Sequence, residues 1–446
     1  MTTMARKLLN VLLVAYLFFL QTALGADIIY DLPTPIQSID ARLSLLSDPD
    51  TKTVDFSTYE LVYDEAGKVF IAALIRAAER GVHIRGIIDN KITDADPMLV
   101  NYLREKGIEL NFHNPIKFSG YDFLHPIKAF QRYNRRLHDK MFIVNSRIFL
   151  LGDKNYANKY YPQLKNIDPS AGYVKGREIV MIGYGVNDYV RYFKGMWNNY
   201  EGLKTEEDIA KLNEPVPEPM RLKFEKQLRA SFIWLAKRMT RLGNWRKNQF
   251  SYEAAHLVSG MPGSGASTLD AIFQKISYAK PGSRVLVENG YLVLFPELKS
   301  AIRSAIKNNV EVVINLNLKS ELLVIQKALD VDLEEIIEIG AKVYLNRYRP
   351  THAKVILLEN AIGEKEVIVT SANFDPRSYN INTESGFSIK SPSLHEFYWS
   401  EFNDRKGGKA FYQKASMCQS FYSNSLFPGK ASLSSRALVK MIRSQL

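Results

Sequence analysis

The stretch RLHDKMFIVN at residues 136–145 is followed closely by IFLLGDKN at residues 148–155. A second stretch, THAKVILLE at residues 351–359, is followed by VIVTSAN at residues 367–373. Both read His-x-Lys, four apolar residues and a polar residue, then another apolar run that ends in a short polar stretch and an asparagine. The repetition of this pattern in two separate places indicates an internal duplication.

The repeated pattern has a defined geometry if each motif forms a strand. Residues two apart on a strand face the same side of a sheet, so each histidine projects together with the lysine that follows it. If the motif strand pairs with the next apolar run as a hairpin, the asparagine at the end of that run lies level with the histidine. Each half then offers an imidazole, an ammonium and an amide to one small volume: His138, Lys140 and Asn155 in the first half, and His352, Lys354 and Asn373 in the second.

Strand and helix signals occur in the same order in both halves of the chain. A strand, an amphipathic helix and a second strand are predicted at residues 53–63, 67–80 and 82–88, and again at residues 283–294, 296–307 and 310–316. This alternation predicts an α/β fold with two pseudo-symmetric lobes, each a mixed sheet flanked by helices. We expect the two histidine motifs to face each other in one shared active site between the lobes.

The composition is that of a globular protein with anionic partners. Hydrophobic residues make up 46% of the 446 residues, enough for a sizeable core, and the length suits two domains or two large lobes. The formal net charge of +12 favours phospholipid headgroups, nucleic acid or polyphosphate as partners, without choosing among them. Cys418 is the only cysteine, so no intrachain disulfide can form.

The amino-terminal residues have the layout of a secretory signal peptide. Arg6 and Lys7 precede an unbroken apolar run of ten residues, 11–20, and small residues follow at positions 23, 25 and 26. The run is short for a membrane-spanning helix, which needs roughly 20 apolar residues. We therefore predict a signal peptide at residues 1–26 and export to the periplasm or the medium, with an uncleaved anchor as the alternative. Any membrane contact by the mature protein is expected to be peripheral.

The region between the two halves is predicted to be a linker followed by a basic helix. Residues 214–219 read EPVPEP, and residues 220–246 form a basic stretch with apolar residues at helical spacing. Packing on a lobe is favoured over contact with an anionic membrane. The predicted domains are a first lobe at residues 27–213, the linker and helix at 214–258, and a second lobe at 259–446.

The glycine-rich stretch GMPGSGAS at residues 260–267 is not predicted to bind a nucleotide. Its glycine spacing resembles that of a phosphate-binding loop, but Ala266 stands where the essential lysine would be. No strong strand leads into the stretch either, so it is interpreted as an ordinary loop.

Two facing histidines predict phosphoryl-transfer chemistry. One imidazole can attack phosphorus and form a covalent phospho-histidine, while the other protonates the leaving oxygen and then activates water or an alcohol. The lysines and asparagines would hold the non-bridging oxygens in the transition state. Each imidazole also needs a carboxylate to fix its tautomer. Glu384 starts the strand ESGFSIK, and Glu178 starts the strand EIVMI at what is predicted to be the matching place.

The remaining polar residues suggest no metal or cofactor. No clustered set of His, Cys and Asp ligands is evident in the sequence, and the mechanism requires none. The five other histidines lack the lysine, asparagine and glutamate neighbours and are expected to be structural: His83, His113, His125, His256 and His395. Of these, His125 is the one expected nearest the site.

The paired motifs resemble those of the phospholipase D superfamily, whose duplicated HKD motif is His-x-Lys, four residues, Asp, then Gly-Ser or Gly-Gly and Asn. The resemblance spans roughly residues 36–398 and is greatest to bacterial cardiolipin synthases and related proteins. It implies two phospholipase D-type lobes, a monomer and no cofactor. It also implies histidines as nucleophile and general acid/base, with His138 as the expected nucleophile, lysines and asparagines as phosphate ligands, and Glu178 and Glu384 as the residues that orient the imidazoles.

This chain departs from the family pattern at three positions. Asn145 and Glu359 replace the motif aspartate, at the far end of the strand from the histidine, where we expect a role in anchoring backbone. Asp153 replaces a small residue beside Asn155 and brings a carboxylate close to the phosphate site. That carboxylate is expected to weaken phosphate binding or to alter the substrate, and a pseudoenzyme remains an alternative.

The resemblance leaves more than one function open. The leading hypothesis is an enzyme that acts on phospholipids, by hydrolysis or by transfer of a phosphatidyl group to an alcohol. The second is a secreted nuclease with the same chemistry, which the basic charge also suits. The third is a non-catalytic protein that binds anionic lipid, although the retained histidines favour catalysis.

Overall fold

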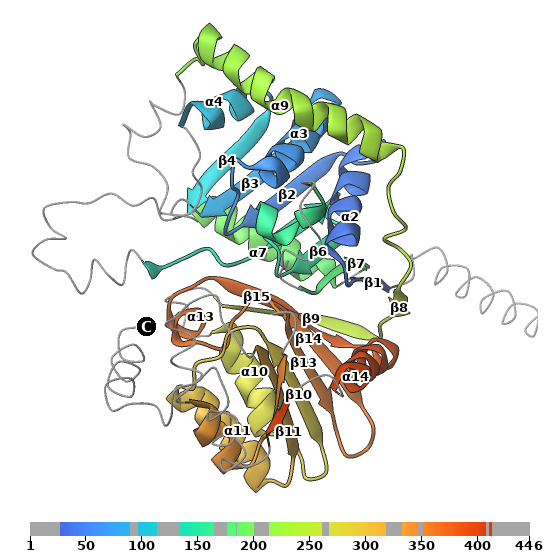
Figure 1. Cartoon of the computed structure of the whole chain (residues 1–446), viewed down its shortest axis with the longest axis vertical. Helices are drawn as coiled ribbons and strands as arrows, with labels where there is room; N and C mark the ends of the chain where they lie inside the picture. Colours follow the sequence, from blue (N-terminus) through green and yellow to red (C-terminus); the bar gives the residue numbers. More distant parts are fainter. Residues whose placement is uncertain are drawn as a thin grey trace, which may run out of the picture.

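A computed structural model describes residues 27–89, 97–113, 134–164, 176–183, 185–199, 214–260, 267–317, 332–346, 351–406 and 410–412. Figure 1 shows two lobes, one formed by the first half of the chain and one by the second. The predicted signal peptide at residues 1–26 lies outside the described residues. Within the described ranges, no helix has both the length and the apolar character needed to cross a membrane.

The first lobe alternates strands and helices as predicted. Its elements are β1 (Ile28–Leu32), α2 (Pro35–Ser47), β2 (Thr53–Thr58), α3 (Glu65–Glu79), β3 (His83–Asp89), α4 (Pro97–Glu105), β4 (Ile108–His113), β5 (Met141–Val144), β6 (Ile148–Gly152), the short 3-10 turns at Asn158–Tyr160 and Pro162–Leu164, β7 (Glu178–Ile182) and α7 (Val186–Asn199). The helix α9 (Glu218–Met239) and the strand β8 (Gln249–Ser251) lead from this lobe to the second.

The second lobe repeats the order. Its elements are β9 (Ala254–Gly260), α10 (Thr268–Ser277), β10 (Arg284–Asn289), α11 (Pro296–Lys307), β11 (Glu311–Asn317), β12 (Lys342–Asn346), β13 (Lys354–Glu359), β14 (Lys365–Thr370), α13 (Pro376–Asn380), β15 (Glu384–Lys390), α14 (Pro392–Lys406) and β16 (Ala410–Tyr412). The helix predicted at residues 296–307 is found with the same bounds.

Each lobe contains one eight-stranded mixed sheet, which confirms the predicted α/β class. The orders are β4-β3-β2-β5-β6-β7-β1-β8 and β16-β12-β11-β10-β13-β14-β15-β9. In each sheet three strands pair in parallel, and the strands of the histidine motif follow as antiparallel neighbours. Strands β8 and β9 lie in different sheets, so the chain enters the second sheet before the boundary predicted at residue 259.

The two lobes share an apolar interface, and helices pack on the sheets. Phe149 of β6 and Phe387 of β15 meet edge to face with ring centroids 5.2 Å apart, within a cluster of buried residues contributed by both halves. The first sheet packs separately with α2 and α3, and the second with α10 and α11. Because both sheets are buried from two sides, the central strands are almost continuously apolar.

The basic helix α9 lies along the outer side of the first lobe (Figure 1). Its residues Phe224, Leu228 and Leu235 are buried and face α3 and α4. This agrees with the prediction that the helix packs on a lobe. Leu222 and Ile233 on its other face are about half exposed, at 56% and 49%.

Candidate active site

The two histidine motifs lie at equivalent ends of the central strands. His138 precedes β5 and His352 precedes β13, and each motif strand forms the predicted antiparallel hairpin, β5 with β6 and β13 with β14. Both imidazoles are nearly buried, with 8% and 7% of their surface exposed. The structure thus places both predicted histidines at strand ends in the interior of the molecule.

The imidazole of the first lobe is held by a carboxylate of the second. His138 Nδ1 lies 2.9 and 3.0 Å from the two carboxylate oxygens of Glu384. Ser371 Oγ donates a hydrogen bond to the same carboxylate at 2.5 Å. The backbone N–H of His138 donates to the carbonyl of Thr383 at 3.1 Å, which fixes one lobe against the other beside the imidazole. Glu384 therefore orients an imidazole, as predicted, but that imidazole belongs to the opposite lobe.

Glu178 does not contact a histidine. Its carboxylate accepts two hydrogen bonds from Arg42 of α2, each at 2.9 Å, and a short one from Ser38 Oγ. Lys154 Nζ lies 3.8 Å away. Burial raises the pKa of Glu178, but the charges of Arg42 and Lys154 outweigh it and lower the pKa to about 2. The carboxylate is therefore ionised and joins α2 to the sheet.

The prediction that Glu178 occupies the place equivalent to Glu384 is wrong by two residues. In the second lobe the N–H of Ser385 donates to Ser371 Oγ at 3.0 Å, next to Glu384. In the first lobe the N–H of Arg177 donates in the same way to Asp153 Oδ2 at 3.0 Å. The residue before Arg177 is Gly176, so a glycine holds the position that Glu384 holds in the second lobe.

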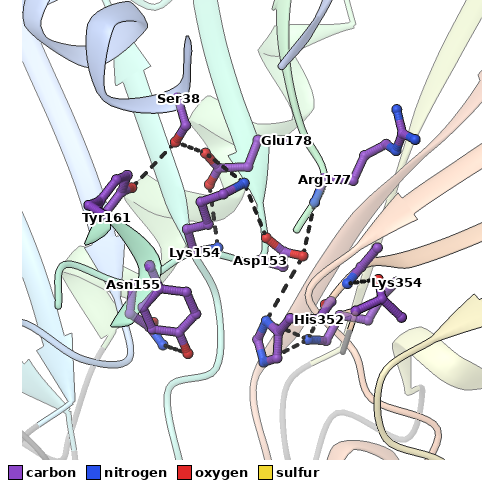
Figure 2. A network of polar contacts seen from close by, with 12 residues as sticks. Ser38, Asp153, Lys154, Asn155, Tyr161, Arg177, Glu178, His352 and Lys354 are labelled. Carbon is purple, nitrogen blue, oxygen red and sulfur yellow. Dashed lines mark hydrogen bonds and ion pairs between the residues drawn. The ribbon is translucent and has the colours of Figure 1, made fainter. Parts of the chain in front are cut away.

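A carboxylate that lies beside His352 is that of Asp153. Its Nδ1 atom lies 3.9 Å from Asp153 Oδ2, a contact that crosses between the lobes (Figure 2). Asp153 is only 1% exposed. The nitrogen atoms of the same ring lie 3.1 Å from Lys354 Nζ. The histidine of the second lobe is therefore set between a carboxylate and an ammonium.

The two motif lysines make matching contacts and lie in a dry environment. Lys140 Nζ donates to the carbonyl of His138 at 2.7 Å, and Lys354 Nζ donates to the carbonyl of His352 at 2.8 Å. Burial lowers the pKa of Lys140 to about 8 and that of Lys354 to about 7, although nearby carboxylates oppose the effect. Burial and the two lysines also hold the pKa of both imidazoles well below the ordinary value. Both imidazoles are therefore neutral at neutral pH.

The two predicted asparagines lie just beyond the hairpin strands. Asn155 Nδ2 donates to Tyr160 Oη at 3.1 Å, and Asn155 is 2% exposed. The side-chain oxygens of Asn155 and Asn373 are buried and accept no hydrogen bond from the residues that the structure describes.

Three tyrosines that surround the histidines were not predicted. The ring centroid of Tyr59 is 5.2 Å from His138, and those of Tyr160 and Tyr291 are 5.7 and 5.6 Å from His352. Tyr59 directly follows β2, and Tyr291 follows β10 by two residues. In open α/β sheets, ligand sites lie just beyond the carboxyl ends of strands, so this position in the sequence was an available signal.

The two residues that replace the motif aspartate, Asn145 and Glu359, make different contacts. Asn145 anchors backbone as predicted, because its Oδ1 accepts from the N–H groups of Lys52 and Thr53 at 2.7 and 3.0 Å. Glu359 instead forms an ion pair with the side chain of Arg284. In the described part of the chain, no group of three or more His, Cys, Asp or Glu side chains is placed to hold a metal ion.

The other histidines make local contacts. His83 Nε2 lies 2.7 Å from Glu109 on an exposed surface, and His395 stacks on Trp399. His113 is buried at the end of β4, and His256 lies exposed on β9. His125, which was expected nearest the site, lies outside the described residues.

Comparison with known proteins identifies relatives over most of the chain. The chain is 24% identical over 384 residues to an uncharacterized protein of Helicobacter pylori J99, covering 77% of this chain and 72% of the relative. It is 24% identical over 414 residues to cardiolipin synthase C of Escherichia coli K12, covering 82% of each. In structure it is similar to phosphatidylserine synthase of Haemophilus influenzae Rd KW20, with a TM-score of 0.62, 14% identity and 95% coverage of both chains.

A family model provides the assignment. The model described as "Cardiolipin synthase, PLD-like domain" matches residues 45–168 and 272–406, which together cover more than half of the chain. The first range includes the motif at His138 and the second the motif at His352. The chain therefore belongs to the family of cardiolipin synthase, phospholipase D-like domain proteins.

Proposed function

We propose that this chain is a phospholipid phosphatidyltransferase that works through a phospho-histidine intermediate. The observation that carries the proposal is the pair of buried, neutral imidazoles at equivalent strand ends of a duplicated fold, each beside its own lysine. Such a pair supplies a nucleophile and a proton carrier to one phosphodiester. The family membership supports the same reading.

The reaction proceeds in two displacements at one phosphorus atom. Because Glu384 holds Nδ1 of His138, we assign to Nε2 the attack on the phosphorus of a phosphatidyl group. The bond from phosphorus to the headgroup oxygen breaks, and the headgroup leaves as an alcohol with a proton from His352. His352 then takes a proton from an acceptor alcohol or water. The acceptor oxygen attacks the phosphorus and releases His138.

Substrate binding favours protonation of His352, and the proton itself is taken up from solvent. Burial and the lysines keep the pKa of His352 low. The negative charge of a bound phosphodiester offsets the charges of Lys140 and Lys354, so the pKa of His352 rises when the substrate is present. The bound substrate thereby favours the protonated acid beside its own leaving oxygen.

The lipid substrate is favoured by the named relatives. The similar protein of Escherichia coli is called cardiolipin synthase C, and the similar structure from Haemophilus influenzae is called phosphatidylserine synthase. The net charge of +12 suits attraction to an anionic membrane surface. We further propose that residues 1–26 direct export and that the mature chain contacts the membrane peripherally.

Product analysis tests this function. The purified protein is mixed with liposomes of phosphatidylglycerol and phosphatidylethanolamine, and phosphatidic acid, released headgroup and cardiolipin are measured by mass spectrometry. Cardiolipin with free glycerol identifies transfer to an alcohol, and phosphatidic acid identifies hydrolysis. Cleavage of DNA or RNA in the absence of any lipid product would contradict the proposal and identify a nuclease.

The pKa values of the lysines predict how the activity depends on pH. Lys354 and Lys140 are charged below their lowered pKa values of about 7 and about 8 and lose that charge as the pH rises through them. We expect kcat/KM for an anionic phospholipid to fall on the alkaline side, by on the order of 100-fold when both are neutral. Initial rates over a pH series measure this. In Lys354→Arg the guanidinium stays protonated, so the alkaline fall should begin at higher pH, and an unchanged profile in that variant would contradict the assignment.

A further inference from the structure

The two lobes carry the carboxylate beside the opposite histidine at different positions. The second lobe has Ser371 at the end of β14 and Glu384 across from it at the start of β15, and Glu384 holds His138. At the matching positions the first lobe has Asp153 and Gly176, as the equivalent bonds from the N–H groups of Ser385 and Arg177 show. The pair Ser and Glu of one lobe thus corresponds to Asp and Gly in the other.

The carboxylate of Asp153 fills the space that a side chain at position 176 would need. A β-carbon built on Gly176 would lie 2.1 Å from Asp153 Oδ1 and 2.6 Å from Oδ2. Such distances are too short for any real contact, so a larger residue at 176 would displace the Asp153 carboxylate from its position. Asp153 therefore places a carboxylate in the space that a glutamate at position 176 would occupy by analogy with Glu384.

The surroundings of Asp153 are those of a positioning group. Its Oδ2 accepts from the N–H of Arg177 and faces His352 Nδ1 at 3.9 Å. Its Oδ1 is buried and accepts no hydrogen bond from the described residues, while Lys154 Nζ lies 3.7 Å away. Figure 2 shows Lys154 between Asp153 and Glu178; because Arg42 already pairs with Glu178, the Lys154 ammonium is available to offset the charge of Asp153. A contact longer than a hydrogen bond is common at a catalytic group before substrate binds.

We propose that Asp153, and not Glu178, is the positioning residue of His352, so that each imidazole is oriented by a carboxylate from the opposite lobe. This inference rests on the proposed function in assigning His352 to the reaction. The substitution expected from the sequence to weaken phosphate binding instead completes the second histidine–carboxylate pair. The shorter aspartate side chain, from the residue that follows β6, lies 3.9 Å from His352, and the glutamate side chain, from the first residue of β15, lies 2.9 Å from His138.

A carboxylate exchange tests the proposal. Asp153→Ser should lower kcat by on the order of 100-fold with little change in KM, because the imidazole loses its orienting partner while the phosphate ligands remain. Gly176→Glu alone should fold poorly or lose activity, because the new side chain meets Asp153. The double variant Asp153→Ser with Gly176→Glu rebuilds the arrangement of the second lobe. Its kcat should be about tenfold or more above that of Asp153→Ser alone. Asp40→Asn, another buried aspartate that pairs with Arg238 outside the site, reports the ordinary cost of such a substitution.

A second readout does not depend on turnover. The NMR chemical shifts of the imidazole nitrogens report tautomer and protonation, and the signals of His352 are assigned by their loss in His352→Asn. Asp153→Ser should move the His352 signals and leave those of His138 in place. Unmoved His352 signals would overturn the inference even in an active enzyme, and so would a Glu178→Gln variant that moves them instead. A wild-type chain that turns over no phospholipid, but whose His352 signals respond to Asp153, supports the pairing and refutes only the proposed function.

Discussion

Replacing either His138 or His352 with asparagine is expected to lower kcat on phospholipid by on the order of 10⁴-fold or more, with the fold intact. Both imidazoles are required in a double displacement. When residues act as a unit, the loss of any one of them removes most of the catalysis. Asparagine keeps a polar side chain in each buried site and avoids an empty cavity. Steady-state rates and an unfolding midpoint, measured on the same preparations, separate lost chemistry from lost stability.

The two variants should differ in the covalent intermediate. If His138 is the nucleophile, His352→Asn retains the attacking group but lacks both the acid for the leaving oxygen and the base for the acceptor. An acid-labile phosphatidyl-enzyme should therefore form slowly and persist, so that it accumulates during a long incubation. In His138→Asn no such adduct can form. Lipid labelled in its phosphatidyl group and intact-protein mass spectrometry make the comparison. An adduct in His138→Asn alone would exchange the two roles, and full activity in either variant would refute the two-histidine mechanism.

Much of this site could be predicted from the sequence because the duplicated His-x-Lys motif can be recognised in the sequence itself. The His-x-Lys spacing and the apolar run after it determine which side chains share a face of the strand. The hairpins β5–β6 and β13–β14 then bring the asparagines back towards the histidines. The backbone role of Asn145 also followed from its place at the far end of the motif strand.

The carboxylate partners could not be predicted in the same way, because they depend on strand register between segments far apart in the chain. Glu178 and Glu384 each precede an apolar run, yet Glu178 pairs with Gly152, and Glu384 lies two positions earlier in its ladder. A shift of two residues preserves the face of the strand, so the pattern of apolar and polar residues does not reveal it. The contact between a carboxylate of one lobe and a histidine of the other is a tertiary feature that no local sequence pattern encodes.

The contacts of Glu178 were likewise hidden in a distant helix. Arg42 and Ser38 lie on α2, where the sequence shows only an amphipathic stretch. Arg42 is 1% exposed, and it also donates to Tyr156 Oη at 3.1 Å. A buried arginine on the inner face of a helix needs a buried carboxylate, but the sequence alone offers many candidates. The structure shows that Glu178 is the partner.

Replacing Arg42 with methionine is expected to lower the free energy of unfolding by about 3–5 kcal/mol, because it leaves the charge of Glu178 buried without its partner. Both side chains are nearly inaccessible, and the pair is joined by two hydrogen bonds of 2.9 Å. Chemical denaturation at neutral pH measures the loss. Lys275→Met, which breaks a much more exposed ion pair with Glu366, is the control and should cost about 1 kcal/mol or less.

The pH dependence of this loss identifies its cause. In the wild type the pKa of Glu178 is lowered from 4.5 to about 2, so its contribution to stability is present above 4.5 and is lost as the pH falls towards 2. In Arg42→Met the carboxylate keeps only the more distant Lys154, so its pKa is higher than in the wild type and it becomes neutral at a higher pH. The deficit of the variant should therefore be largest at neutral pH and should shrink on acidification. The double variant Arg42→Met with Glu178→Gln should recover most of the stability at neutral pH, because it removes the uncompensated charge. A deficit that is independent of pH, or that persists in the double variant, would show that Arg42 stabilises the fold by packing alone.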